Sequence, residues 1–201
     1  MIAVITGDII NSQHADTEVW ITKLKNLLEN WGSSPLTWEI YRGDEFQFKC
    51  TIDEVFWCFL AIKSVIKSQE NLDVRMAIGI GEENFSSDKI TESNGTAYVY
   101  SGRLLNGLKS DGDTVAIKTS NEAVDRDLNM LLKWSSKDFD KWTMATAEII
   151  HEMIMNEDIT QEDLAKKFAI SQSSVSQRLK RANYDLIIET NQYFRKKISE
   201  L

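Results

Sequence analysis

The chain has 201 residues, with 23 Lys and Arg against 31 Asp and Glu and a formal net charge of −8. Hydrophobic residues make up 42% and charged residues 27%, which excludes a mainly disordered chain. The acidic balance excludes a uniformly basic nucleic-acid coat and a polybasic membrane binder, but it leaves room for a local basic site. No stretch reaches the roughly 20 apolar residues of a membrane-spanning helix, so we expect a cytoplasmic protein.

The first part of the chain alternates strand and helix patterns. Residues 2–6 (IAVIT) are apolar and mostly β-branched and are followed by Gly7-Asp8, which predicts a buried strand ending in a polar turn. The following patterns predict, in order, a helix, two strands of a hairpin, a helix and a fourth strand over residues 17–31, 37–42, 45–50, 52–68 and 73–81. Gly43 suits the hairpin turn because glycine accepts positive φ.

A polar loop over residues 82–94 leads to the remaining elements of this part. We expect a helix over 98–108, a strand over 114–118, a small helix over 121–131 and a connection over 132–142. The order β-α-β-β-α-β-α-β contains the split βαβ pattern. It predicts an α+β fold whose ferredoxin-like domain spans residues 1–135.

Residues 136–201 are predicted to form an all-α helix-turn-helix domain that binds DNA. Helical patterns cover 144–155, 160–168 and a long stretch over 172–198, with Thr160 and Ser171 as N-caps. Ala165 is small where the second and third of these helices would meet. The segment TQEDLAKKFAISQSSVSQRLKRA resembles the helix-turn-helix of bacterial regulators and of the sigma-factor DNA-binding region.

The charge supports a local DNA site in this segment, because residues 166–184 contain five basic residues and no acidic one. Ser and Gln can contact base edges, and Arg and Lys can contact phosphates. The predicted DNA-binding residues are Lys166, Lys167, Gln172, Ser173, Ser176, Gln177, Lys180 and Arg181. The alternative is an ordinary helical hairpin with a solvated face, since Ala169 occupies the turn position that usually holds glycine.

Three carboxylates suggest a second site. Asp8 follows the first strand, and Asp44 with Glu45 lies in the hairpin YRGDEFQF. If the first strand lies beside the hairpin, Asp8 and Asp44 could face each other and bind Mg²⁺, which would hold a nucleoside triphosphate. The alternatives are a plain hairpin turn at Gly43-Asp44 and a loop carboxylate at Asp8.

At these residues the chain resembles known families. RGDEF resembles the GGDEF signature of diguanylate cyclases, and VITGDIINS resembles the metal-binding first strand of palm domains. GTAYVYSGRLLNGLKSDGDTVAIKTS is similar to the cyclase segment with a transition-state arginine, which implies that role for Arg103; a solvated helix residue is the alternative. The chain departs from these patterns at two positions. Arg42 stands where the GGDEF signature has its first glycine, and Val99 stands where the cyclase segment has an asparagine four residues before the arginine. The whole arrangement resembles the SatD family over essentially the full chain.

These observations lead to three functional hypotheses. The first is a bacterial DNA-binding regulator whose N-terminal domain binds or senses a ligand such as a nucleotide. The second is an enzyme, a Mg²⁺-dependent nucleotidyl cyclase or nucleotidyltransferase that uses Asp8 and Asp44. The third is a scaffold protein that forms a homodimer through its final helix. The apolar residues expected to hold this dimer are Leu186, Ile187, Tyr193, Phe194 and Ile198. A homodimer also fits the first hypothesis, because helix-turn-helix proteins often bind paired half-sites.

Overall fold

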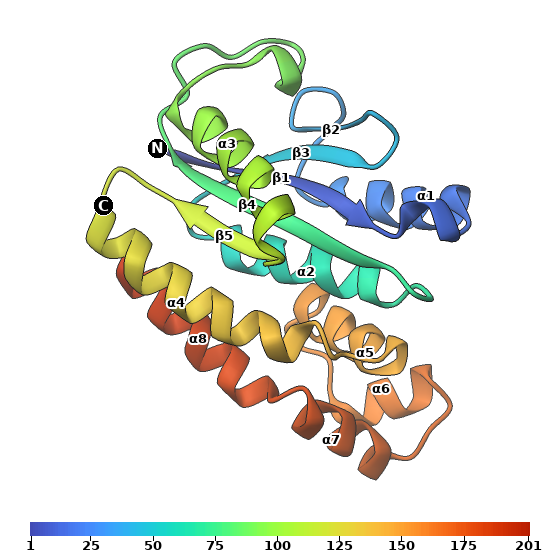
Figure 1. The fold of residues 1–201 in the computed structure, drawn as a ribbon. Coiled ribbons are helices and arrows are strands. Elements are labelled where there is room, and N and C mark those ends of the chain that lie inside the picture. Colours follow the sequence, from blue (N-terminus) through green and yellow to red (C-terminus); the bar gives the residue numbers. More distant parts are fainter.

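The computed structural model describes residues 1–201 and has a mixed α+β fold, with a five-stranded sheet and eight α-helices (Figure 1). The strands are β1 (Ile2–Ile10), β2 (Trp38–Tyr41), β3 (Glu45–Cys50), β4 (Asp73–Gly81) and β5 (Val115–Lys118). The α-helices are α1 (Thr17–Leu28), α2 (Val55–Lys67), α3 (Thr96–Asp111), α4 (Glu122–Phe139), α5 (Met144–Met155), α6 (Gln161–Lys167), α7 (Gln172–Arg181) and α8 (Tyr184–Ile198). Two short 3-10 helices are η1 (Ser12–His14) and η2 (Ile90–Glu92).

Strand β1 lies at the centre of the sheet, whose strand order is β2-β3-β1-β4-β5. It runs antiparallel to both of its neighbours, and only β4 and β5 are parallel. The predicted turn at Gly7-Asp8 is wrong, because β1 continues to Ile10. Asp8 is a strand residue that stands opposite Glu45 of β3 and Arg75 of β4. Pairing on both sides keeps this stretch extended, although its own sequence favours a turn.

Helices cover both faces of the sheet (Figure 1). Trp20 of α1 and Phe59 of α2 share one hydrophobic cluster with Ile5 of β1 and Phe46 of β3. The other face carries α3, which packs closely against β4. A Cβ atom added at Gly79 would lie 2.1 Å from the main-chain oxygen of Ala97, so only glycine permits this approach.

The C-terminal helices pack against α2 and α4 and share the main core of the sheet. The hydrophobic cluster of 41 buried residues runs from Ala3 to Ile198. A buried ion pair also joins the two parts, because Lys63 Nζ of α2 lies 2.5 Å from Asp73 Oδ1 and 2.6 Å from Asp140 Oδ1. The domain boundary expected between residues 135 and 136 falls inside α4.

Helix α4 corrects the prediction of a short helix followed by a connection over 132–142. It runs unbroken from Glu122 to Phe139. Asn121 caps its start, since the side chain accepts from the main-chain N–H groups of Ala123 and Val124. The buried residues that follow recur every three or four positions, as on one face of a helix: Val124, Leu128, Leu132, Ser136 and Phe139.

The predicted single helix over 172–198 is also wrong. It breaks after Arg181 into α7 and α8, and Asn183 at the break has a φ of 51° in the left-handed region. Asparagine tolerates this conformation better than most residues. The break turns α8 so that Ile187, Phe194 and Ile198 are buried within the chain's own core. These three residues therefore cannot form the dimer contact that the sequence predicted.

Candidate functional site: a charged cluster on the sheet and an exposed basic helix

The first candidate site is a charged cluster on the side of the sheet that faces α3. Arg75 Nη1 donates to both carboxylate oxygens of Asp8, at 3.1 and 2.9 Å. Lys109, near the end of α3, donates to Glu45 Oε1 at 2.9 Å and lies 3.9 Å from Asp8 Oδ2. The hydrogen bond to Glu45, together with the charge of Asp8, raises the pKa of Lys109. Two acids and two bases thus neutralise each other here.

Asp44 takes no part in these ion pairs. It lies in the hairpin turn, where it accepts a hydrogen bond from Ser12 Oγ at 3.0 Å. The turn is a three-residue loop, with Tyr41 opposite Glu45 and positive φ at Arg42 and Gly43. Asp44 is therefore near Asp8 in the fold, since its main-chain oxygen accepts from Ile9 N at 3.0 Å, but its carboxylate is engaged elsewhere.

Asp8, Asp44 and Glu45 are the residues predicted to bind Mg²⁺. Mg²⁺ requires oxygen ligands that are free to converge in octahedral geometry. The oxygens of Asp8 and Glu45 are instead bound by Arg75 and Lys109, and no group of three or more His, Cys, Asp or Glu residues is placed to hold a metal. The residues in this arrangement do not fit the ion, and we derive no reaction step through it.

Arg103 lies apart from this cluster. Helix α3 turns Ser101, Leu105 and Leu108 towards the sheet and buries them. At 100° per residue, Arg103 is about 200° away from Ser101 and lies on the opposite, exposed side. The structure thus does not bring Arg103 to the carboxylates.

Sequence reasoning missed Arg75 and Lys109, which define the cluster. The signal for Arg75 was present in DVRMAIGIG, because strand alternation places this arginine on the face opposite Val74 and Met76. Lys109 carried no comparable signal, because its partners lie more than 60 residues away in the chain.

The second candidate site is formed by α6, the turn after it and α7. Thr160 and Asp163 form a capping box at the start of α6. The turn contains Ala169 with a φ of 51°, where glycine would be unstrained. Buried Leu164 on α6 and Val175 and Leu179 on α7 hold the two helices together. The structure therefore fixes the angle between two short helices and leaves one side of α7 free.

All eight residues predicted to contact DNA are exposed. Lys166 and Lys167 on α6 approach Asp163 at 4.0 Å and Glu152 at 2.6 Å, respectively. Lys180 and Arg181 form no ion pair and lie in the last turn of α7. Gln172 donates to Gln161 Oε1 at 2.7 Å. The polar residues at 173, 176 and 177 complete the exposed side of α7.

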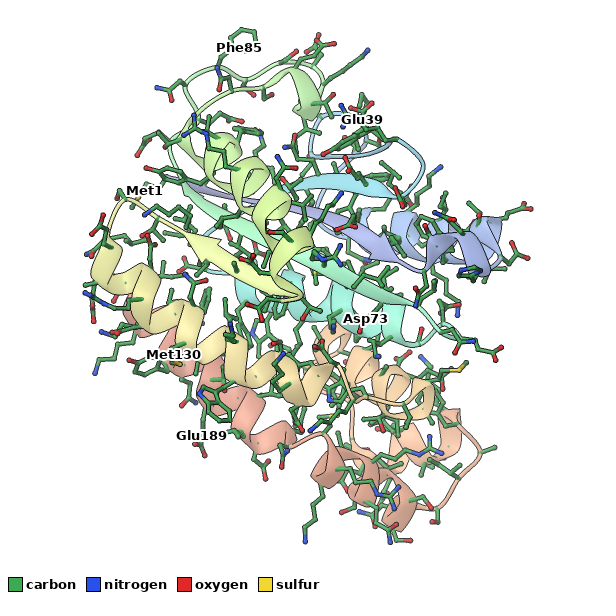
Figure 2. All side chains as sticks on the ribbon, in the orientation of Figure 1. Met1, Glu39, Asp73, Phe85, Met130 and Glu189 are labelled. Carbon is green, nitrogen blue, oxygen red and sulfur yellow. The ribbon has the colours of Figure 1, made fainter.

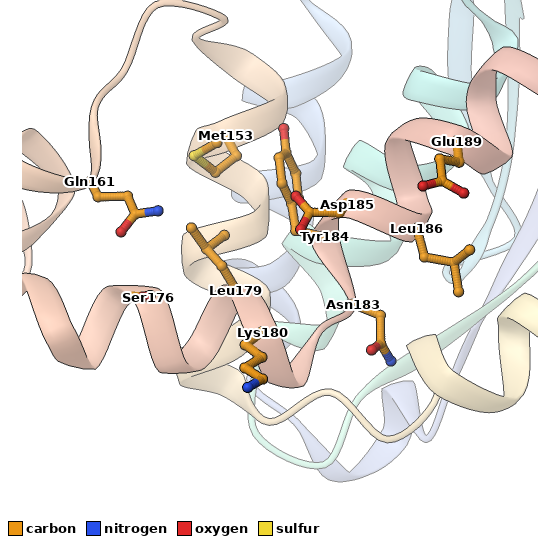
Figure 3. Close-up of a pocket in the computed structure, with 10 residues that line it drawn as sticks. All are labelled: Met153, Gln161, Ser176, Leu179, Lys180, Asn183, Tyr184, Asp185, Leu186 and Glu189. Atoms are coloured by element: carbon orange, nitrogen blue, oxygen red, sulfur yellow. The ribbon is translucent and has the colours of Figure 1, made fainter.

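A cavity of about 700 Å³ adjoins α7 and is drawn in Figure 3. It is lined by residues of α5, α6, α7 and α8, including Ser176 and Lys180 from the predicted DNA-contact set. Tyr184 also lines it, and burial, with the charges of Asp185 and Glu157, raises the pKa of its hydroxyl. The acidic start of α8 thus limits the basic surface of α7 on this side.

One histidine lies between the sheet and the C-terminal helices. His151 of α5 has its Nδ1 3.2 Å from Ser64 Oγ of α2. Burial lowers the pKa of His151, and the charges of Lys167 and Lys23 lower it further, while Glu152 opposes them. A neutral imidazole is therefore favoured at the contact between α2 and α5.

None of the helices combines the length and the apolar character that spanning a lipid bilayer requires.

The comparisons with known proteins give one match. No curated protein and no solved structure matches the chain at a significant level. The model of the SatD family matches residues 1–198, and the chain therefore belongs to the SatD family.

Proposed function

We propose that this protein is a DNA-binding regulator in which α6 and α7 form a helix-turn-helix. The observation that carries the proposal is the exposed side of α7, where serine and glutamine side chains lead to Lys180 and Arg181, both without ion-pair partners. The left-handed conformation of Ala169 supports it, because a helix-turn-helix needs a sharp turn at this position. Phosphates can bind free lysine and arginine side chains, and base edges can accept or donate to serine and glutamine.

The experiment is fluorescence anisotropy with a labelled pool of random-sequence DNA duplexes at several salt concentrations. We expect binding at low salt, with an affinity that falls as salt rises. Arg181→Ala should weaken binding and reduce the salt slope by about one. The matched control is Arg103→Ala, which removes an exposed arginine from α3 and should leave binding unchanged. No affinity at low salt, or an equal loss in both variants, would contradict the proposal.

We also propose that the N-terminal part is a palm-like domain that binds a ligand such as a nucleotide. Its first four strands follow the chain order β-α-β-β-α-β and lie in the order β2-β3-β1-β4, which supports a split βαβ architecture. Arg75 and Lys109 are cations that phosphate oxygens could bind in place of Asp8 and Glu45. A thermal shift assay with the four nucleoside triphosphates tests this, and no shift with any of them counts against it.

The enzymatic alternative, a Mg²⁺-dependent nucleotidyl cyclase or nucleotidyltransferase, has less support. That alternative needs the carboxylates of Asp8 and Asp44 to be free to bind the ion. The two residues are near each other in the fold, but the Asp8 carboxylate is bound by Arg75 and the Asp44 carboxylate accepts from Ser12. The assay is product formation from each triphosphate with Mg²⁺ or Mn²⁺, with Asp44→Asn as the inactive variant. Product formed by the native chain but not by Asp44→Asn would support the enzymatic alternative.

A further inference from the structure

Two neighbouring helices present an apolar face that nothing in the chain covers. Met130 and Trp134 of α4 are 61% and 74% exposed, and Leu186 and Tyr193 of α8 are 58% and 42% exposed. We call these four residues the α4/α8 face. In Figure 2, Met130 and Glu189 mark the two helices that carry it.

The two helices run antiparallel and are fixed to each other at both ends. Lys197 Nζ at the end of α8 lies 2.9 Å from Asp127 Oδ2 of α4. Asn183 Nδ2, just before α8, donates to Asp138 Oδ2 at 3.0 Å. A groove of about 350 Å³ between them is lined by Trp134, Leu186 and other residues, so it can receive a bulky side chain.

The exposed area of the face is in the range of the largest apolar patch on a typical monomer, a patch that is often functional. Its four side chains expose roughly 400–500 Å² together. Two such faces in contact would bury roughly 800–1,000 Å², and the flanking polar residues would bring the total towards the range of a specific interface, about 1,200 Å² and above. A second copy of the chain is therefore sufficient to cover it.

The charges beside the face are self-complementary, although Asp127 is already paired with Lys197 of its own α8 and would share its carboxylate with a partner lysine. Along α4, Asp127, Met130, Trp134 and Lys137 follow one another at spacings of three, four and three residues, on one side of the helix. Lys137 is exposed and has no ion-pair partner. If α4 of a second copy lies antiparallel on this stripe, Asp127 faces Lys137 and Met130 faces Trp134, twice by symmetry.

We propose that the α4/α8 face binds a second copy of this chain about a two-fold axis, with the two α4 helices antiparallel. The interface differs from the one predicted from sequence, because it uses α4 and only the outer residues of α8. It is independent of the proposed DNA binding, and its tests contain no DNA, so either can fail alone.

The test is sedimentation velocity on the full chain from roughly 1 to 100 μM. We expect a dimer, and Trp134→Ser should raise its dissociation constant about tenfold or more, since interface tryptophans are typical hot spots. Phe85→Ser is the matched control, because Phe85 is 59% exposed and lies in the loop before α3, away from this face (Figure 2). A monomer at every concentration, or a dimer that Trp134→Ser leaves intact, would overturn the proposal.

A second pair of variants tests the antiparallel arrangement. Lys137→Glu should weaken the dimer, because it places a carboxylate opposite Asp127 of the partner. Lys25→Glu makes the same charge change at an exposed, unpaired lysine of α1 and should have no effect. Circular dichroism confirms that each variant is folded. Equal behaviour of the two variants would overturn the arrangement.

Discussion

Substitution of Asp8 distinguishes an ion-pair role from a metal-ligand role. The guanidinium of Arg75 makes its only hydrogen bonds to Asp8, and its Nε is buried without a partner. Asp8→Asn keeps the shape but removes the negative charge, so it leaves a mostly buried arginine without a counter-ion. In a metal site the same change would relieve repulsion between carboxylates and stabilise the metal-free protein.

The magnitude follows from the burial of the pair. The side chains of Asp8 and Arg75 are 13% and 19% exposed, which places the pair between a surface and a fully buried salt bridge. Surface pairs contribute about 0–1 kcal/mol and breaking a buried pair costs about 3–5 kcal/mol, so we expect Asp8→Asn to cost about 2 kcal/mol. In a chain of this length that corresponds to a fall in Tm of about 4–8 °C.

The assay is thermal and urea unfolding in a chelator, followed by circular dichroism. Asp88→Asn is the matched control, because Asp88 is exposed and forms no ion pair. It should leave the free energy of unfolding unchanged. A more stable Asp8→Asn variant, or a Tm that Mg²⁺ raises in the native chain and not in this variant, would refute the ion-pair interpretation and favour the metal site.

Three further predictions concern stability. Lys63→Met should lower the free energy of unfolding by about 2 kcal/mol in urea titrations, because it leaves two partly exposed carboxylates without their shared cation while Lys67 stays 3.4 Å from Asp73. Ala169→Gly should raise it by about 1 kcal/mol, since glycine adopts the left-handed conformation without strain; a loss would show that Ala169 does not hold that conformation. Because burial lowers the pKa of His151, the unfolded chain binds its proton first as the pH falls through 6.5, so stability should decrease there, and His151→Gln should flatten that part of the pH profile.

Hydrophobic periodicity predicted the helices and strands whose buried residues follow a regular spacing along their own sequence. The strand over 73–81 and the helix over 144–155 have the predicted bounds. Periodicity failed where tertiary contacts decide. Asp8 is in a strand because β3 and β4 pair with it on both sides, which no local pattern reveals.

The break between α7 and α8 left no readable signal in the apolar pattern. Val175, Leu179 and Ala182 follow helical spacing, and Leu186, four positions on, continues it in the sequence. In the structure Leu186 is exposed and Ile187 is buried instead, so the phase shift of the buried residues appears only after folding. No Gly or Pro marks the break.

The predicted carboxylates of the candidate metal site are close in the fold, but their chemical state depends on residues that the motif did not contain. A signature such as RGDEF specifies the turn and its acids. Whether those acids are free depends on Arg75 and Lys109, which reach them from a different strand and from a helix. The cations that pair with these carboxylates can therefore be identified only from the structure.

The contacts also show how the charged cluster connects to the C-terminal helices. Arg75 holds Asp8, and two residues earlier on the same strand Asp73 accepts from Lys63. Lys63 also donates to Asp140, which lies between α4 and α5, and α5 packs on α7. A ligand that draws Arg75 away from Asp8 would therefore act on β4, which Lys63 connects to Asp140, shortly before the start of α5. The path is continuous, but coupling needs two arrangements of these contacts that the ligand distinguishes. DNA affinity measured with and without nucleotide, in the native chain and in Lys63→Met, separates such coupling from simple proximity.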